Sequence, residues 1–136
     1  MRHLDVRRLG CVSYADGLAL QQELVEERRA GCIPDTLLLL EHPPVLTVGV
    51  RPGSRRHVIA TSDALAAAGI EIHETGRGGD VTYHGPGQLV AYPLVDLQRA
   101  GFFVKSYIHK LEEALIRTLW HFGVVGHRVE IGRAHV

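Results

Sequence analysis

The amino-acid sequence predicts an α+β fold, in which a mixed or largely antiparallel sheet is flanked by helices. Short apolar runs of strand length, such as residues 36–40, are bounded by turn-forming residues, whereas residues 14–29 and 104–122 repeat apolar side chains with the period of an amphipathic helix. The chain has 136 residues, of which 46% are hydrophobic, so it can bury a core. We therefore expect one compact unit.

The first half of the chain is predicted to form a helix followed by two strands. In residues 14–29, YADGLALQQELVEERR, apolar residues gather near one helical face, and the helix should end before Gly31 and Pro34. Those apolar residues are Leu18, Leu20, Leu24 and Val25. Residues 35–50 contain two apolar runs typical of buried strands, joined by the EHPP segment at 41–44.

A second, shorter helix is predicted within TSDALAAAG, residues 61–69. Thr61 or Ser62 can cap its first turn, and Gly69 can end it, because glycine readily takes the left-handed conformation found after helices. The IEIHE segment at 70–74 then has the alternation of a strand.

A strand and a long helix are predicted beyond the middle of the chain. Residues 88–97, QLVAYPLVDL, have strand character, and Pro93 favours an edge or a bulge because it cannot donate to a neighbouring strand. From Val104 onward, apolar residues recur along one helical face until Gly123 ends the pattern. They are Val104, Ile108, Leu111, Leu115, Leu119 and Phe122.

Composition argues against several classes of function. Basic and acidic residues balance at 15 each, so no global field favours nucleic acid or an anionic membrane, and we expect neither as a partner. The N-terminus has Asp5 and no apolar run of a secretory signal, which favours a cytoplasmic protein. Cys11, on a segment expected to be buried, and Cys32 should then be free thiols. Neither the cysteines nor the histidines have metal-ligand spacing, so we expect no metal and no cofactor.

The most unusual stretch is RGGDVTYHGPGQ, residues 77–88, with four glycines in twelve positions. Glycines allow the backbone to approach a ligand or another segment closely. Strand alternation would place Val81 and Tyr83 on one face and their polar neighbours on the other. No GK[ST] follows and no GxGxxG opens a helix, so the stretch is not a common phosphate-binding loop. It predicts either a ligand-binding segment or a hairpin with a glycine-rich turn.

This stretch resembles the signature of the octanoyltransferases of lipoate biosynthesis, the lipoyl(octanoyl) transferases. The family pattern is RGG, then T-[YF]-HGPGQ, running into a Y-P strand, which residues 77–97 match. EHPPVLTVGVR at 41–51 and LGCVSYADGLALQQELVEERR at 9–29 resemble its upstream segments. The resemblance extends from residue 4 to about residue 130. It implies the fold shared by biotin and lipoate protein ligases, related to class II synthetases, with residues 1–130 as the N-terminal part of one incomplete domain.

The resemblance also implies a reaction, the transfer of an octanoyl group from octanoyl-acyl carrier protein to a lysine of apo lipoyl domains. The acceptors would be the lipoyl domains of 2-oxoacid dehydrogenases and the H protein of glycine cleavage. The substrate-binding residues that it implies are Arg77, Gly78, Gly79, Asp80, Val81, Thr82, Tyr83 and His84. The glycines would form narrow walls for the acyl tail, with polar side chains near the thioester carbonyl. His84 could orient that carbonyl or be a structural histidine, and Glu41 and His42 are expected to shape the pocket wall.

No catalytic residue is assigned within this sequence. The family uses a cysteine activated by a lysine, in P-C-G and K-[IL]-A-A-I-G motifs, and neither motif occurs here, so we expect the fragment to be inactive alone. Residues 131–136, IGRAHV, depart from the family pattern and match a sequencing adapter translated in one frame, so we interpret them as a non-native tail. Two alternatives stay open: an ATP-dependent lipoate or biotin ligase on the same fold, and a non-catalytic acyl-binding module.

Overall fold

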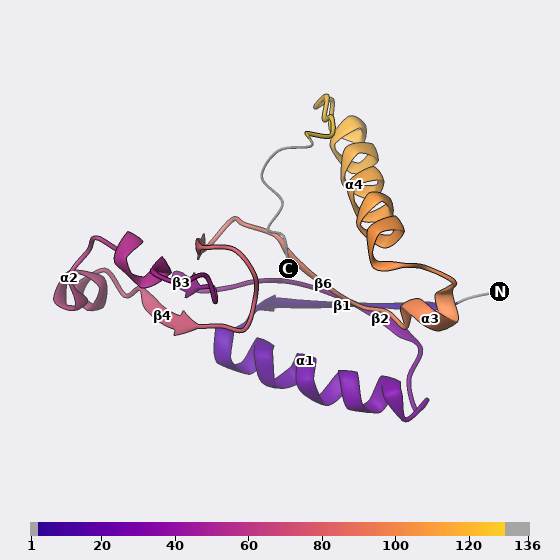
Figure 1. Cartoon of the computed structure of the whole chain (residues 1–136), viewed down its shortest axis with the longest axis horizontal. Helices are drawn as coiled ribbons and strands as arrows, with labels where there is room; N and C mark the ends of the chain where they lie inside the picture. The colour runs from indigo at the N-terminus through magenta and orange to yellow at the C-terminus, as the bar shows by residue number, and fades with distance from the viewer. Residues whose placement is uncertain (1–2, 130–136) are drawn as a thin grey trace. The chain divides into compact units, whose positions relative to one another are not determined.

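A computed structural model describes residues 3–129, and Figure 1 shows the order of its helices and strands. The described residues form two compact units, residues 3–94 and residues 95–129. The first unit contains all the described strands and the whole glycine-rich stretch. Residues 131–136, the predicted non-native tail, lie outside the described residues.

The first sheet of the larger unit has the strand order β1-β2-β6. Strand β1 (Leu4–Cys11) runs parallel to β2 (Asp35–Glu41), and β6 (Val90–Leu94) is antiparallel to β2. Two parallel neighbours need a crossover connection, which helix α1 (Tyr14–Arg29) provides. Figure 1 shows α1 along one face of this sheet.

The core of the larger unit lies between α1 and the first sheet. Leu24 of α1, Leu38 of β2 and Leu94 of β6 are buried against one another. Five partly buried residues pack around them, namely Leu9, Leu20, Ile33, Val25 and Tyr92. Leu18 is 42% exposed, so the predicted apolar face of α1 is narrower than its sequence pattern.

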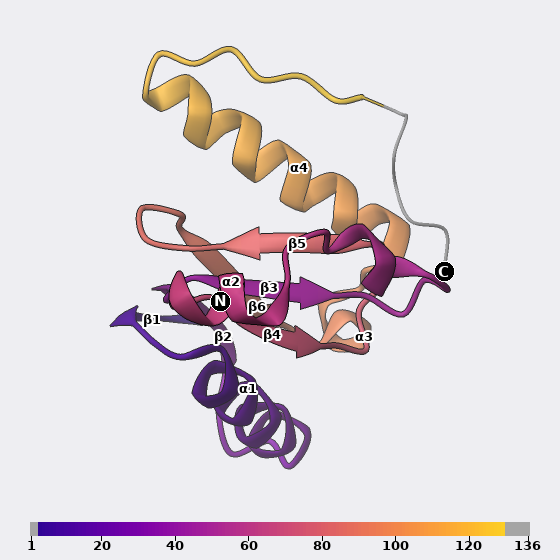
Figure 2. The same cartoon turned by 90° about the vertical axis from the view of Figure 1, so that its left-hand side faces the viewer.

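The second sheet has the strand order β4-β3-β5, and Figure 2 shows the three strands side by side. Strands β3 (Val45–Val48) and β4 (Glu71–Glu74) are parallel, and β5 (Val81–His84) is antiparallel to β3. The 3-10 helix η1 (Ser54–His57) and helix α2 (Ser62–Ala67) lie on the crossover from β3 to β4. The predicted mixed α+β class is confirmed, with the strands divided between two sheets.

Most predicted elements form where the sequence placed them, and their ends have the expected causes. Thr61 caps α2 by accepting a hydrogen bond from the Ala64 amide, and Gly69 follows the helix with a φ of 65°. Pro93 lies on an edge strand, as its missing amide hydrogen predicted. Strand β1, η1 and the four-residue helix of the smaller unit form in segments for which the sequence pattern gave no prediction.

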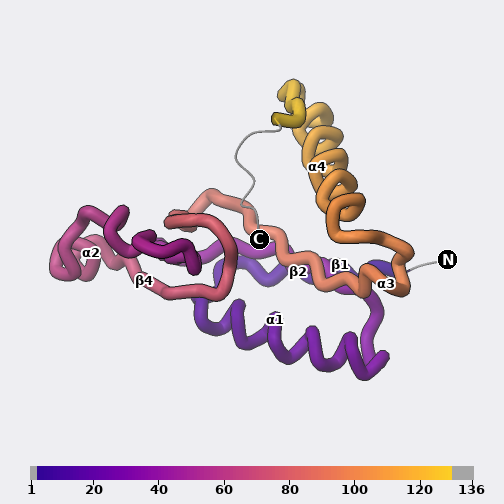
Figure 3. The backbone as a smooth tube through the Cα atoms, viewed as in Figure 1, coloured from indigo at the N-terminus to yellow at the C-terminus, as the bar shows by residue number. Residues whose placement is uncertain are grey.

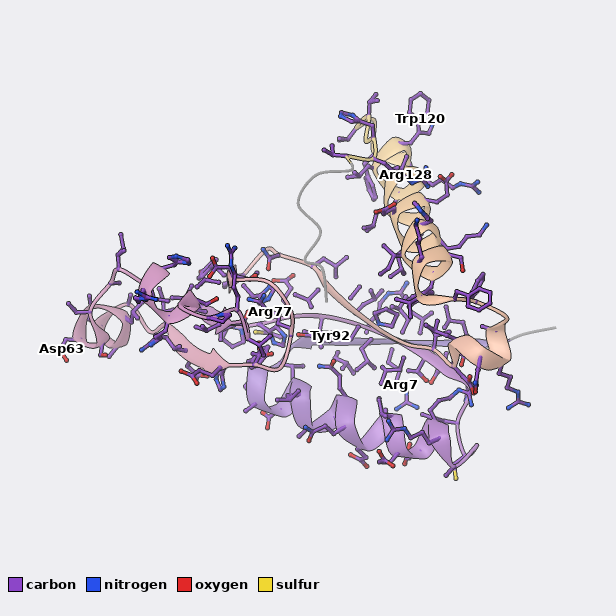
Figure 4. All side chains as sticks on the ribbon, in the orientation of Figure 1. Arg7, Asp63, Arg77, Tyr92, Trp120 and Arg128 are labelled. Atoms are coloured by element: carbon purple, nitrogen blue, oxygen red, sulfur yellow. The ribbon has the colours of Figure 1, made fainter. Side chains whose placement is uncertain are left out.

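The smaller unit consists of α3 (Leu97–Ala100), α4 (Val104–His121) and the segment that follows. Helix α4 confirms the long amphipathic helix, and Gly123 follows it with a φ of 77°. Figure 4 shows Trp120 projecting from the last turn of α4, where it is 69% exposed. Within the described part of the chain, no helix is both long enough and apolar enough to cross a membrane.

A close approach between two backbones joins β3 to the loop before β5. The Gly49 amide donates to the Asp80 carbonyl at 2.9 Å, and the Val50 amide donates to the Arg77 carbonyl at 3.1 Å. A Cβ atom on Gly49 would overlap the Gly79 carbonyl oxygen. Because the clashing atoms belong to the backbone, only a shift of the loop could relieve the overlap.

We therefore predict that Gly49→Ala lowers the free energy of unfolding by about 1–3 kcal/mol, the usual cost of overpacking. Gly76→Ala is the matched control, since a Cβ there meets no atom within 4 Å and should change stability by less than about 0.5 kcal/mol. Chemical denaturation of both variants measures the difference. Equal stability of the two would contradict the close approach.

Candidate functional site

The predicted substrate-binding span, residues 77–84, forms a loop and the edge strand β5 of the second sheet. Figure 3 traces the chain from β4 through this loop and on into β6. The first four residues of the span belong to the loop, namely Arg77, Gly78, Gly79 and Asp80. The other four form β5, namely Val81, Thr82, Tyr83 and His84. Gly78 and Tyr83 are exposed and the rest are half-buried.

Arg77 holds this loop against β3 through hydrogen bonds to the protein itself, and Figure 4 labels its position. One terminal nitrogen, Nη2, donates to the Thr47 carbonyl at 2.7 Å and to the Asp80 carbonyl at 2.8 Å. Its Nε and Nη2 also reach the Thr47 hydroxyl, and Nη1 donates to the Gly78 carbonyl. Each nitrogen of the guanidinium therefore donates to the protein itself, and these bonds fix the loop that leads into β5.

The Asp80 side chain ties the same loop to η1. Its Oδ2 accepts a hydrogen bond from His57 Nδ1 at 2.7 Å. This hydrogen bond is the main reason why the pKa of Asp80 lies below its ordinary value, because it favours the ionised carboxylate. Asp80 thus acts as an anchor between two loops.

His84, at the end of β5, has one ring nitrogen held by the protein. Its Nδ1 lies 2.6 Å from Gln88 Oε1, and because an amide oxygen only accepts, Nδ1 carries the hydrogen in this pair. In the neutral ring, Nε2 is then a hydrogen-bond acceptor. The turn between His84 and Gln88 is closed by the Gln88 amide, which donates to the Gly85 carbonyl at 3.1 Å.

His42 is a fully buried histidine next to His84, with ring centroids 6.0 Å apart. Its Nδ1 lies 2.7 Å from the Val12 carbonyl oxygen, and its Nε2 lies 2.8 Å from the Tyr92 hydroxyl. Since a carbonyl can only accept, Nδ1 donates to Val12, and Nε2 of the neutral ring accepts from Tyr92. Both ring nitrogens are thereby satisfied without a solvent molecule.

Aromatic rings surround His42 and join the two sheets. The Tyr14 ring packs edge-on against His42 at 5.4 Å and lies 5.0 Å from the His73 ring on β4. The first turn of α1 also comes close to His42, since a Cβ on Gly17 would lie 3.1 Å from His42 Cε1. We call the five rings Tyr14, His42, His73, His84 and Tyr92 the ring cluster.

The two tyrosines of the ring cluster have pKa values above the ordinary value for tyrosine. Burial is the main cause for both hydroxyls, because it disfavours the charged phenolate. The positive charge of Arg77 opposes the rise at Tyr14, and a hydrogen bond from Gln21 opposes it at Tyr92. Both hydroxyls therefore stay protonated to higher pH in the folded protein than in the unfolded chain.

Glu41, at the end of β2, fixes the HGPG turn that follows β5. Its Oε2 accepts a hydrogen bond from the Gly87 amide at 2.7 Å, and Gly87 has a φ of 84°, a conformation that favours glycine. Gly85 is buried beneath the Tyr83 ring, whose hydroxyl would overlap a Cβ at that position. Gly87 and Gly85 are therefore explained by contacts within the protein, the first with the Glu41 carboxylate and the second with the Tyr83 ring.

The site offers hydrogen-bonding groups and contains no nucleophile matched to the family's motif. Cys11 is exposed at the end of β1, which corrects the prediction that it is buried, and Cys32 is exposed as well. In the part of the chain that the structure describes, no cluster of three metal-binding side chains occurs. Nε2 of His84 can polarise a bound carbonyl group only from the protonated ring, because Nε2 of the neutral ring has no hydrogen to donate.

Sequence reasoning assigned no role to Tyr14, His73 or Tyr92, although the structure places all three in the ring cluster. The available signal was the position of Tyr14 and Tyr92 within segments that match the family pattern. His73 had no such signal, because its strand lies outside the motif segments that resemble the family pattern. Their contacts depend on how the two sheets meet, and alternation along one strand does not show that.

Residues 13–134 match the family described as the lipoyl protein ligase A/B catalytic domain. An octanoyltransferase of Acidobacterium capsulatum is 53% identical over 133 residues, covering 93% of this chain and 54% of the relative. An octanoyltransferase of a Polaromonas species is 49% identical over 127 residues, covering 93% of this chain and 47% of the relative. The chain thus spans about half the length of these relatives.

Solved structures of lipoate protein ligases have a similar fold. A lipoate protein ligase of T. acidophilum superposes with a TM-score of 0.66 at 17% sequence identity, over 99% of this chain and 53% of the ligase. A lipoate-protein ligase A bound with ATP gives a TM-score of 0.62 at 15% identity, over 99% of this chain and 52% of the ligase. At such identities the likeness establishes the fold alone, and it confirms the predicted ligase-like architecture.

The hydrogen bond between His42 and Tyr92 leads to a prediction about stability and its pH dependence. Tyr92→Phe leaves the buried His42 Nε2 without its donor, so the free energy of unfolding should fall by about 1–3 kcal/mol. In the wild type, that free energy should decrease above about pH 10, because the tyrosines ionise in the unfolded chain before they ionise in the folded protein. The decrease should be shallower in Tyr92→Phe.

Urea denaturation between about pH 7 and about pH 11 measures both effects. Tyr83→Phe is the control, because Tyr83 is 48% exposed and its hydroxyl is not part of the pair. A Tyr92→Phe protein as stable as the Tyr83→Phe protein would show that the pair contributes nothing.

Proposed function

The chain belongs to the lipoyl protein ligase A/B catalytic-domain family, and on this premise we propose that it takes part in octanoyl transfer for protein lipoylation in the cytoplasm. The observation that carries the proposal is the identity of about half of its residues to proteins named octanoyltransferase, along more than nine-tenths of the chain. The donor would be octanoyl-acyl carrier protein. The acceptors would be lysines of apo lipoyl domains in 2-oxoacid dehydrogenases and of the H protein of glycine cleavage.

Octanoyl transfer is favoured over ATP-dependent ligation of lipoate or biotin. The ligases are 15–17% identical to this chain, whereas the octanoyltransferases are 49–53% identical. The HGPGQ block, residues 84–88, is intact here, and its histidine and glutamine are hydrogen-bonded to each other. The proposed substrate is therefore an acyl thioester, which is already activated and needs no nucleotide.

Transfer of this kind needs two exchanges at the acyl carbonyl. A thiolate of the enzyme attacks the donor thioester, so that a new thioester forms and the carrier thiol leaves. The lysine amine of the acceptor then attacks the acyl-enzyme, forms the amide and returns the thiol. Within the described residues, the proposed task of this chain is to bind the octanoyl group and orient its carbonyl.

We assign this binding task to the span from Arg77 to His84. His84 Nε2 is the group proposed to lie nearest the carbonyl, to which it would donate from the protonated ring, because Gln88 holds the ring through the Nδ1 hydrogen. Arg77 and Asp80 hold the loop in place, and the small residues Gly78 and Gly79 leave room for an acyl chain beside the backbone. The proposed binding surface is thus rigid before the substrate arrives.

The proposed binding role predicts that the 136-residue chain binds octanoyl-pantetheine, a thioester without a carrier protein. His84→Ala should weaken this binding about tenfold, as expected for the loss of a hydrogen bond from the protonated imidazole to the carbonyl. His121→Ala is the control, because His121 lies at the end of α4, in the other unit. Isothermal titration calorimetry measures both affinities. No binding by the wild type, or equal weakening in both variants, would contradict the assignment.

We further predict that this chain does not become covalently acylated. The proposed nucleophile and its activating lysine belong to family motifs that are absent from the sequence, and the exposed Cys11 and Cys32 match neither motif. Intact mass spectrometry after incubation with octanoyl-acyl carrier protein at neutral pH should show the unmodified mass. A stoichiometric octanoyl adduct on either cysteine would show that acyl-enzyme formation does not need the absent motifs.

A further inference from the structure

A basic loop lies between β3 and α2. The segment RPGSRRH, residues 51–57, contains three arginines and a histidine in seven positions. Arg51, Arg55 and Arg56 are all exposed, and none of them forms an ion pair with a carboxylate in the part of the chain that the structure describes. We call these three residues the basic loop.

Most other arginines of the described chain have an acidic partner. Three arginines pair with an acidic residue close by in the sequence: Arg7 with Asp5, Arg29 with Glu26 and Arg117 with Glu113. Arg28 pairs with Asp35 and Arg128 with the acidic residues of α4. In a chain whose formal net charge is zero, the basic loop is therefore a local concentration of positive charge, of which Arg51 is near enough to Asp80 to interact with its carboxylate.

The basic loop is fixed to the proposed octanoyl-binding span. His57, in the same segment, donates to Asp80 at 2.7 Å, and the Val50 amide donates to the Arg77 carbonyl at 3.1 Å. Ser54, between Arg51 and Arg55, is 2% exposed, so this part of the segment is packed against the protein. A partner bound at the arginines would thus be held directly beside residues 77–80.

Apolar side chains flank these charges. Ile59 is 95% exposed and Val50 is 63% exposed, and both lie within a few residues of the arginines. Exposed aliphatic groups bordered by arginines are typical of protein–protein interfaces, where arginine is enriched. The segment 50–60 has no Phe, Tyr or Trp on which a nucleic-acid base could stack, and its imidazole, His57, is held by Asp80. This composition favours a protein partner over a nucleic acid.

We propose that the basic loop, with Ile59, is the docking surface for an acidic face of the acyl carrier protein that delivers the octanoyl group. The proposal rests on the octanoyl-transfer function proposed above and adds the surface that would recognise the donor protein. The carrier is favoured over the acceptor domain because the loop is fixed to the span proposed to receive the acyl chain. Opposite charges would raise the rate of encounter and set the orientation in which the thioester reaches the span.

Binding of octanoyl-acyl carrier protein to the 136-residue chain tests this proposal. Arg55→Glu should weaken the binding about tenfold or more, because it places like charge opposite the carrier. Arg8→Glu is the matched control, since Arg8 is exposed on β1 of the first sheet and should change the affinity less than about twofold. Raising the salt concentration from about 50 to about 300 mM should weaken wild-type binding and narrow the gap between the variants.

Octanoyl-pantetheine separates the failure of docking from the failure of the proposed function. If the wild type and Arg55→Glu bind this small thioester equally and only Arg55→Glu loses the carrier protein, the docking surface is supported. If both proteins bind the carrier equally, or if Arg55→Glu also loses the small thioester, the docking proposal is wrong while octanoyl binding by the wild type stands. If the wild type binds neither ligand, both proposals are wrong.

Two further measurements control for misfolding of Arg55→Glu and for binding of nucleic acid in place of the carrier protein. Ile59→Asp, at a side chain that is 95% exposed, provides a second variant that should also lose the carrier protein, in case Arg55→Glu melts at a lower temperature than the wild type. Single-stranded RNA that displaces the carrier protein and binds more tightly would show that the arginines recognise phosphates, and would overturn the proposal.

Discussion

The buried His42 imidazole is the interaction on which the arrangement of the larger unit depends. Its two hydrogen bonds tie the end of β1, through Val12, to β6, through Tyr92. An imidazole without solvent contact costs about 1–3 kcal/mol for each nitrogen left unsatisfied, so both partners must be in place together. Gly17 is small because the ring occupies the space where its side chain would be. The first turn of α1 and the ends of two strands are therefore positioned by one side chain.

The same ring also determines what surrounds the proposed binding span. Tyr14 bridges from His42 to His73 on β4, and His84 of β5 packs against His42 from the second sheet. Arg77 then locks the loop before β5 onto β3 through backbone carbonyls. Few groups in this region are free to reorganise, and a site that orients a carbonyl benefits from such rigidity, because no energy is lost in ordering it when the substrate binds.

Sequence periodicity was enough to predict the long helices and the central strands, because buried apolar residues recur at intervals that local geometry imposes. It failed for β1, whose arginines and exposed Leu4 and Val6 lack the pattern of a buried strand. The family resemblance identified residues 77–84 as a binding span, a role that stays a prediction. The resemblance could not show that Arg77 donates its hydrogen bonds to the protein itself, since its partner Thr47 lies 30 positions away in the sequence. Such contacts follow from topology, which one sequence pattern does not contain.

The hydrogen bonding of the histidines indicates which chemistry the described residues can supply. His57 donates to Asp80, His73 to Glu71, His84 to Gln88 and His42 to a backbone carbonyl. Each ring is oriented by an oxygen that only accepts, so one nitrogen is committed as a donor and unavailable as a base. In the ring cluster, His42 has both nitrogens committed, whereas His73 is bonded through Nε2 and His84 through Nδ1. His84 belongs to the proposed span, so its Nε2 is the group proposed to meet a substrate. An imidazole fixed in this way can donate from Nε2 to a carbonyl when the ring is protonated, and the covalent steps of acyl transfer require a thiolate that the ring cluster does not contain.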